Sequence, residues 1–217
     1  MIPKLSRFLI LLFFLASVGE SFGQSNLKYW ISGIYASSQI HSGFISNSTY
    51  SLLPGPGIGL SIKNSYFNRL HLGLDIGYIL LKNVYKHPEN NNWELSTPNI
   101  EALPNVEINF RLFGKYMRKN TSTPYIKFAP SLNVFQPRLS NISGFDDTFV
   151  FFPYSYLSVG WYVGAGYKFL IKNHYLLQLE FFFNNMNTNK ASGFGKEDSF
   201  VPDRYMGVRI MYSFMKL

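Results

Sequence analysis

The chain of 217 residues contains no cysteine, so no disulfide contributes to its stability. This absence excludes the small exported modules that depend on such bridges in place of a large core. Charged residues are also scarce, at 15% of the chain, against about 25% in an average soluble domain. The net charge is +8, but the longest basic run is only KYMRK at residues 115–119, and we expect no nucleic-acid partner.

The first residues have the pattern of a secretory signal peptide. Lys4 and Arg7 precede an apolar run from Phe8 to Val18, and small residues and a Ser21-Phe22-Gly23 site follow. The apolar run is about half as long as the roughly 20 residues that a membrane-spanning helix needs. We therefore expect residues 1–23 to be cleaved and residues 24–217 to form one domain.

The chain is rich in aromatic residues (18%) and in alternation of apolar with polar residues. In the stretch RLHLGLDIGYILLK, at residues 69–82, apolar side chains occupy every second position, and His71 and Asp75 lie between them. Similar runs occur at residues 57–63, 100–112, 126–134, 157–169, 177–184 and 206–214, with a weaker run near 27–37. This pattern predicts eight β-strands.

Strand length and loop length favour a membrane barrel over a soluble sandwich. Most of the runs exceed the roughly five or six residues of an average strand and suit a tilted strand that crosses a bilayer. The connections alternate between long (38–54, 81–98, 136–153, 185–203) and shorter (64–69, 113–122, 170–174). This layout is typical of an all-β, eight-stranded antiparallel up-and-down transmembrane β-barrel in the outer membrane, with both termini in the periplasm.

Aromatic side chains near the strand ends predict a girdle at each membrane interface. For the periplasmic interface we expect Tyr29, Trp30, Tyr66, Phe67, Phe110, Phe113, Tyr125, Tyr167, Phe169, Tyr175, Tyr212 and Phe214. For the other interface we expect Tyr35, Tyr78, Phe135, Tyr154, Tyr156, Phe183 and Tyr205.

The polar face of each strand is predicted to line the barrel interior, because only a closed barrel satisfies backbone groups inside hydrocarbon. An eight-stranded barrel is narrow, and side chains fill it. The expected interior network consists of Lys63, His71, Asp75, Glu107, Arg111, Lys127, Lys168, Glu180 and Arg209. We expect ion pairs of Glu180 with Arg209, and of Glu107 with Arg111 or Lys127. Such a network indicates a packed polar core rather than a conducting path or an active site.

Five segments resemble the outer membrane protein β-barrel domain family of Bacteroidota: FGQ at the end of the signal, NIEALPNVEINFRLF, TPYIKFAPSL, VGWYVGAGYKF and RYMGVRIMYSF. The resemblance covers essentially the whole mature chain and rests on alternation and aromatic strand ends. Members commonly have a Leu-Glu-Ile-Pro-type fourth strand, where this chain has Ile100-Glu101-Ala102-Leu103-Pro104. The family includes the PorT component of the type IX secretion machinery, so the resemblance implies a location and an architecture, and no catalytic residues.

Motifs for enzymatic or metal chemistry are weak. The glycine-rich segment at 55–59 lacks the Lys-Ser/Thr of a phosphate loop, and the Ser-x-x-Lys match at 213–216 ends a strand instead of starting a helix. The four histidines, at positions 41, 71, 87 and 174, have no ligand spacing. We expect no catalytic site, no metal site and no cofactor.

Three function classes remain open. The first is a non-enzymatic barrel with a structural, loop-mediated or secretion-assembly role. The second is an outer-membrane enzyme acting on lipid A or phospholipid, for which His41, Ser42, Asp75 and Glu94 are candidates. The third is a soluble calyx that carries an apolar ligand, although the predicted interior is too polar for it.

The expected partners are outer-membrane lipid and lipopolysaccharide, the barrel-assembly machinery and a possible secretion-system protein. Four phenylalanines, Phe145, Phe149, Phe151 and Phe152, concentrate apolar surface in the loop at 136–153. They predict a docking or mouth-covering role, or else residues 149–152 only extend the sixth strand above the membrane. Near the C-terminus, Tyr212 and Phe214 resemble the terminal signal that the assembly machinery reads.

Overall fold

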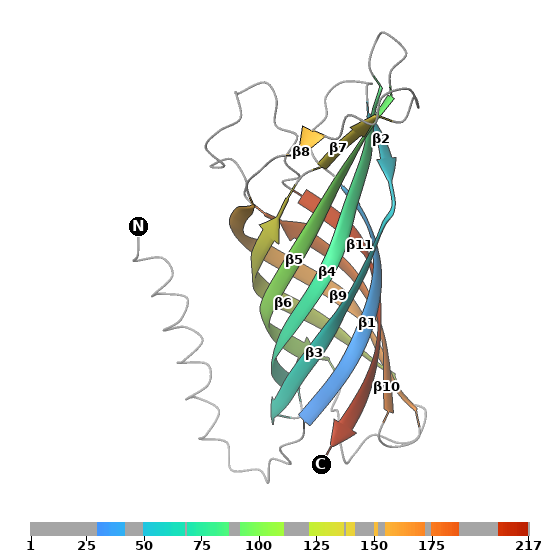
Figure 1. The fold of residues 1–217 in the computed structure, drawn as a ribbon. Helices are drawn as coiled ribbons and strands as arrows, with labels where there is room; N and C mark the ends of the chain where they lie inside the picture. The colour runs from blue at the N-terminus through green and yellow to red at the C-terminus, as the bar shows by residue number, and fades with distance from the viewer. Residues whose placement is uncertain are drawn as a thin grey trace.

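The computed structural model of the protein (Figure 1) describes residues 30–41, 50–67, 69–86, 92–110, 122–136, 138–141, 150–151, 155–171, 175–186 and 204–216. The predicted signal peptide at residues 1–23 lies outside this part of the chain. Among the described residues, no helix has the length and apolar character needed to cross a membrane.

Eight antiparallel strands form a closed barrel. They are β1 (Trp30–His41), β3 (Gly55–Phe67), β4 (Leu70–Lys86), β5 (Asn92–Asn109), β6 (Ser122–Phe135), β9 (Tyr156–Ile171), β10 (Tyr175–Asn185) and β11 (Arg204–Lys216). Each strand pairs with its neighbour along the chain, and β1 also pairs with β11, which closes the ring. These are the eight predicted runs, although the first strand continues past the expected end at residue 37 to His41.

The two faces of the wall follow the predicted alternation. Outward side chains are apolar and strongly exposed; Ile58, Leu60 and Ile62 on β3, for example, are 64%, 60% and 54% exposed. Their inward neighbours Ser61 and Lys63 are buried. An apolar band around a whole barrel greatly exceeds the exposed apolar patch of an ordinary soluble monomer. This surface fits hydrocarbon.

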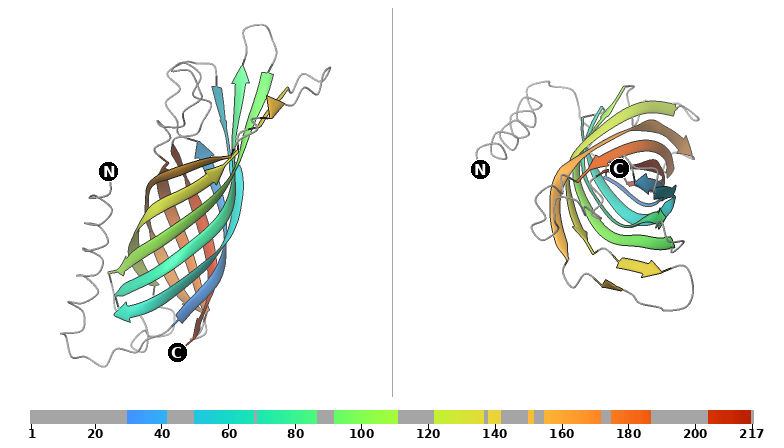
Figure 2. Two further views of the ribbon diagram at one scale, coloured as in Figure 1. Left: turned by 60° about the vertical axis from the view of Figure 1, so that its left-hand side comes forward. Right: turned by 90° about the horizontal axis from the view of Figure 1, so that it is seen from above.

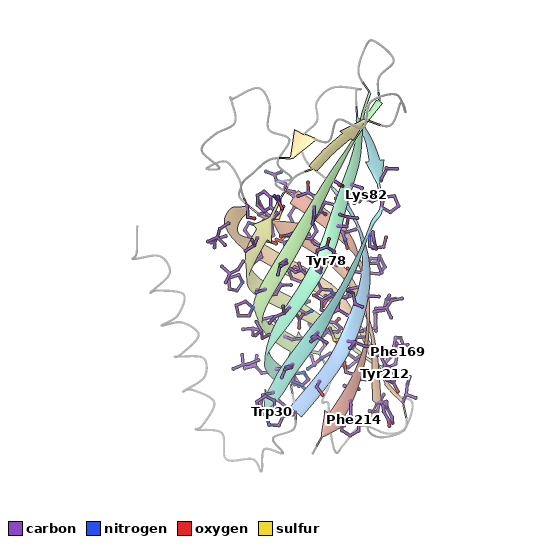
Figure 3. All side chains as sticks on the ribbon, in the orientation of Figure 1. Trp30, Tyr78, Lys82, Phe169, Tyr212 and Phe214 are labelled. Carbon is purple, nitrogen blue, oxygen red and sulfur yellow. The ribbon has the colours of Figure 1, made fainter. Side chains whose placement is uncertain are left out.

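The two ends of the barrel differ. Strands β3 and β9 end, and β4 and β10 begin, at the end of the barrel where β11 finishes, which we call the turn end (Figure 1). Exposed Trp30, Phe169, Tyr212 and Phe214 lie near this end, whereas Tyr78 lies nearer the other end, the loop end (Figure 3). The described aromatic side chains thus include an interfacial group at the turn end.

A five-stranded sheet continues past the barrel at the loop end. β4 and β5 stay paired as far as Lys86 and Asn92, and three short strands join them: β2 (Tyr50–Leu53) on β4, β7 (Arg138–Asn141) on β5, and β8 (Val150–Phe151) on β7. Figure 2 shows this loop-end extension rising above the rest of the barrel.

The loop-end extension corrects the expected loops at 38–54, 81–98 and 136–153, because each of them contains strand residues. The sequence pattern stops where the strands leave the apolar band. Beyond that level no hydrocarbon requires one face to be apolar, so a strand can continue without the alternation that would predict it.

Candidate functional site

The interior of the barrel holds a charge-balanced network of buried side chains. Among the residues that the structure describes, four carboxylates and four cations lie inside with at most 1% exposure. They are Asp75, Glu101, Glu107, Glu180, Lys63, Lys127, Lys168 and Arg209. Each one contacts a partner of opposite charge. Pairing is what makes burial of so many charges tolerable, because an isolated buried charge is very costly.

The turn-side cluster gathers three basic groups around one carboxylate. Lys63 Nζ lies 2.7 Å from Glu107 Oε2, and His71 Nδ1 lies 3.0 Å from Glu107 Oε1, which Lys168 also contacts. Lys63 additionally donates a hydrogen bond of 3.3 Å to Gln178 Oε1. Strands β3, β4 and β9 are therefore all linked to a single side chain of β5.

The loop-side cluster shares its charges more evenly. Lys127 Nζ lies 3.1 Å from Asp75 Oδ2 and 2.7 Å from Glu180 Oε2. Arg209 Nη1 lies 3.2 Å from the same Asp75 oxygen, while its Nη2 lies 2.6 Å from Glu101 Oε1. Two cations thus connect three carboxylates, and Asp75 and Glu180 each contact both cations.

The contact between Arg209 and Glu101 spans the full width of the lumen. β11 and β5 are separated by three strands along either path around the barrel. Tyr205, also on β11, donates a second hydrogen bond to Glu101 Oε2 at 2.7 Å. Side chains from opposite walls therefore meet at this level, and the lumen is bridged there.

Buried tyrosine hydroxyls donate additional hydrogen bonds to the carboxylates. Tyr162 and Tyr125 donate hydrogen bonds of 2.5 and 3.0 Å to Glu180, and Tyr35 donates one of 3.2 Å to Glu101. Hydrogen bonds to a charged group are stronger than those between neutral groups, so these hydroxyls stabilise the ionised carboxylates.

Glycines on β3 and β4 make room for Tyr35. A Cβ atom at Gly59 or Gly77 would collide with the Tyr35 ring or its hydroxyl. The two glycines are register partners, and Gly59 is also opposite Tyr35. The guanidinium carbon of Arg209 lies 4.0 Å from the centroid of the same ring. The two glycines thus leave space for the Tyr35 ring, which makes a cation–π contact with Arg209.

Two clusters of buried apolar and aromatic side chains share the interior with the charged network. The loop-end apolar cluster consists of Ile79, Leu81, Leu103, Ala129, Tyr162, Phe182, Met186 and Tyr205. The turn-end apolar cluster consists of Ile31, Leu170, Leu176 and Met215. Tyr162 and Tyr205 donate hydrogen bonds to Glu180 and Glu101, so the loop-end apolar cluster packs directly against the loop-side cluster.

Most of the predicted network residues lie together in the lumen: Lys63, His71, Asp75, Glu107, Lys127, Lys168, Glu180 and Arg209. Arg111 is outside the described residues. The sequence interpretation missed Glu101, which has the same odd-numbered position on its strand as Asn105 and Glu107 and so shares their inward face. Strict use of the alternation would have found it.

One expected ion pair forms and another does not. Arg209 Nη1 lies 3.7 Å from Glu180 Oε1 on the adjacent strand, as expected. Of the two partners expected for Glu107, Arg111 lies outside the described residues, and the pairing with Lys127 is wrong although these two residues are register partners on β5 and β6. Lys127 instead reaches Asp75 and Glu180, because long side chains in a narrow barrel cross the lumen and find partners two strands away.

Four aromatic residues assigned to the girdles point into the barrel instead. Tyr35, Tyr125, Phe135 and Tyr205 are at most 2% exposed. All four occupy inward positions of their strands, so alternation overrides the general preference of aromatic residues for the membrane interface. Three of them supply hydroxyl groups to the buried carboxylates.

The C-terminal pair, Tyr212 and Phe214, faces outward at the turn end, with 47% and 43% exposure. Both rings contact Tyr175 on β10, each with ring centroids 5.7 Å apart. This placement suits an interfacial anchor, and recognition of these residues by assembly machinery stays a prediction.

The loop and enzyme candidates are only partly described. Phe145, Phe149 and Phe152 lie outside the described residues, and only the backbone of Phe151 is described, in β8. The enzyme hypothesis relied on His41, Ser42, Asp75 and Glu94. Of their side chains only that of Asp75 is described, and it is engaged by Ser61 (2.6 Å), Lys127 and Arg209 inside the barrel. Within the described residues, no group of three or more potential ligands could hold a metal ion.

Among the comparisons with known proteins, only that with solved structures found matches. No protein-family profile and no characterised protein sequence matches the chain. Among solved structures, OprG from Pseudomonas aeruginosa is similar over 89% of this chain and 98% of that protein, with 12% identity and a TM-score of 0.52. Neisserial surface protein A covers 87% of this chain and 97% of its own, with 18% identity and a TM-score of 0.47. The chain thus has the fold of the small eight-stranded outer-membrane β-barrels.

Proposed function

We propose that the protein is an integral outer-membrane barrel without enzymatic activity, and that its loop-end extension binds a protein partner. The observation that carries this proposal is the contrast between the bridged interior and the projecting sheet. Ion pairs between opposite walls occupy the lumen, whereas β2, β4, β5, β7 and β8 project beyond it. A binding activity therefore has more room on the extension than inside the barrel.

Membrane location follows from the outer surface. Large apolar side chains such as Leu157 (73% exposed) and Phe181 (62%) would be costly in water, and a closed barrel leaves no unpaired edge in hydrocarbon. With the predicted signal peptide, this surface favours the outer membrane, with both termini in the periplasm. Lipopolysaccharide and the barrel-assembly machinery are then the general partners.

A PorT-like role in assembly of a secretion machine is the specific form of this proposal. It is supported by the resemblance of the strand sequences to the Bacteroidota barrel family, and by an extension suited to contact with another protein. The extension has backbone edges at β2 and β8, and an extended segment of a partner can pair with such an edge.

The proposal is tested by shortening the hairpin of β4 and β5. Asn83 and Leu95 are register partners, so residues 84–94 can be replaced by an Asn-Gly turn without a change of register. In a matched control, residues 87–91 are replaced by Gly and Ser, which preserves both strands. Chemical crosslinking in whole cells is followed by purification, and the heated-against-unheated gel shift shows whether each barrel is folded.

We expect the shortened variant to lose its crosslinked partner and the control to retain it, with both barrels folded. Retention of every crosslinked product by the folded, shortened variant contradicts a binding role for the extension. The non-enzymatic part is tested by comparing lipid A and phospholipid from cells with and without the protein. A changed lipid pattern that depends on the protein refutes it. Release of the protein into buffer without detergent would refute the membrane location and favour a soluble carrier.

A further inference from the structure

Prolines are concentrated at one seam of the barrel wall. β5 contains Pro98 and Pro104, and β6 contains Pro124 and Pro130, whereas the flanking strands β4 and β9 contain none. Proline has no N–H group, so it is normally confined to edge strands, strand starts and bulges. Two adjacent strands inside a closed barrel are an unusual place for four of them.

At all four prolines, the backbone hydrogen bond that is lost would have joined β5 to β6. The amides of Phe110 and Gln136 donate hydrogen bonds to the carbonyls of Pro124 (3.0 Å) and Pro98 (3.1 Å) across β5 and β6. In an antiparallel pair, the hydrogen-bonded positions recur at every second residue, so these two bonds fix the even-numbered residues as the bonding positions. Pro104 and Pro130 occupy bonding positions opposite each other, and neither can donate.

The pairing of β5 with β6 is accordingly interrupted in its middle. It runs from residues 99–102 and resumes at Val106, which leaves Leu103, Pro104 and Asn105 without register partners on β6. By contrast, β4 pairs with β5 without interruption from Leu70 to Lys86, and β6 with β9 from Ser122 to Phe135. The proline seam is therefore held by fewer hydrogen bonds than the seams on either side.

The interruption has apolar side chains on both faces of the wall. Inside, Leu103 and Ala129 flank it together with the polar Asn105 and Ser131, and the first two belong to the loop-end apolar cluster. Outside, Phe128 and Leu132 of β6 are 46% and 42% exposed on the apolar band. The interruption thus separates the loop-end apolar cluster from the surrounding hydrocarbon.

We propose that the seam between β5 and β6 is a lateral portal that admits one aliphatic chain of a membrane amphiphile to the loop-end apolar cluster. Leu103 and Ala129 inside, with Phe128 and Leu132 outside, contact an aliphatic chain, and none of these four side chains offers a partner to a charged head group. Opening here breaks fewer backbone hydrogen bonds than opening the seam on either side. The inference rests on the membrane location proposed above.

A disulfide across the interruption tests the portal. Extending the register by one residue from Val106 and Phe128 places Asn105 opposite Ala129, and both side chains are buried on the inward face. The chain has no native cysteine, so Asn105→Cys combined with Ala129→Cys forms one defined crosslink. The protein is placed in lipid nanodiscs with 16-doxyl-stearate, a fatty acid with a spin label near its chain end, and methyl NMR signals are recorded before and after oxidation.

We expect the label to broaden the methyl signals of Ile79 and Leu103 in the reduced protein, and oxidation to remove that broadening. Leu170 and Leu176 of the turn-end apolar cluster provide the internal control, whose signals should not depend on oxidation. Equal broadening of Ile79 and Leu103 in both states, or none in either, overturns the portal. The heated-against-unheated gel shift of the same samples separately reports whether the barrel is folded in lipid.

A second variant restores the missing donors without a crosslink. Pro104→Val with Pro130→Val allows two backbone hydrogen bonds to form, so amide exchange at Val106 and Leu132 should slow about tenfold or more. The broadening of Ile79 and Leu103 should fall as well. Unchanged broadening in this folded variant would also contradict a portal at the proline seam.

Discussion

The inward and outward positions of the same strands place different requirements on their side chains. An outward side chain such as Leu74 needs only to be apolar, because lipid is its partner at every point around the barrel. An inward side chain such as Glu107 needs particular partners, and these come from three other strands. Substitutions outside are therefore governed by depth in the bilayer, and substitutions inside by which charges lose a partner.

The interior itself shows two ways to balance charge. The turn-side cluster concentrates Lys63, Lys168 and His71 on Glu107, whereas the loop-side cluster spreads two cations over three carboxylates. Loss of a single acceptor is thus more damaging in the first cluster than in the second.

The largest effect is expected for Glu107→Gln. It leaves Lys63 and Lys168 buried together without their carboxylate, and loss of one partner of a buried ion pair costs about 3–5 kcal/mol. Urea unfolding in detergent or lipid measures the change. Gln178→Leu, which removes a neutral partner of Lys63, is the matched control and should cost less. An unchanged free energy of unfolding for Glu107→Gln would show that the cluster does not stabilise the barrel.

The next effect concerns the lipid face. Leu74→Arg should destabilise the barrel by about 2–4 kcal/mol if this residue lies near the bilayer midplane, because a charge must enter hydrocarbon. Leu74→Phe should have little effect, since it keeps the position apolar. Folding into lipid vesicles is followed by the gel shift. Normal folding of Leu74→Arg would mean that the outward and inward faces have been assigned in reverse.

A smaller effect is expected for Tyr205→Phe, which removes one hydrogen bond to Glu101 while Arg209 and Tyr35 remain bound to it. The expected loss is about 1–3 kcal/mol, the range for an unmade hydrogen bond to a buried charged group. Tyr212→Phe on the outward face is the control and should be close to neutral. An equal loss of unfolding free energy for the two substitutions would contradict the claim that only the inward hydroxyl is needed for stability.

The smallest effect on stability is expected for Phe214→Ala, since this ring lies at the surface of the turn end. It should slow assembly in cells while the assembled barrel keeps its stability, and Lys216→Ala should change neither. The fraction of compact, unheated protein in outer-membrane preparations measures assembly over time. An assembly rate equal to the wild-type rate would contradict a role of Phe214 in recognition by the assembly machinery and would leave it only the role of an interfacial anchor.

Alternation along the sequence predicted the eight barrel strands and the direction of nearly every described side chain. It did so because a lipid-exposed barrel favours apolar side chains at the outward positions along the whole length of each strand. The errors occurred where a composition rule was given priority over alternation, as for Tyr35 and Tyr205, which were assigned to the membrane interface although their positions face inward.

Other features depend on contacts that a single strand does not encode. The partners of Lys127 follow from the width of the lumen, and register with β5 alone gave the wrong partner, Glu107. The loop-end extension lies beyond the apolar band, where alternation carries no signal. The proline seam becomes visible only when the hydrogen-bonding phase of β5 and β6 is known.

A double-mutant cycle between Arg209 and Glu101 tests most directly whether the barrel is closed and bridged as described. Arg209→Met, Glu101→Gln and the double variant are unfolded in urea, and the free energies are compared. Because β11 and β5 are on opposite walls, only a closed barrel with a bridged lumen brings these residues into contact. We predict a coupling energy of about 1–3 kcal/mol, whereas additivity within about 0.5 kcal/mol would contradict the bridged interior.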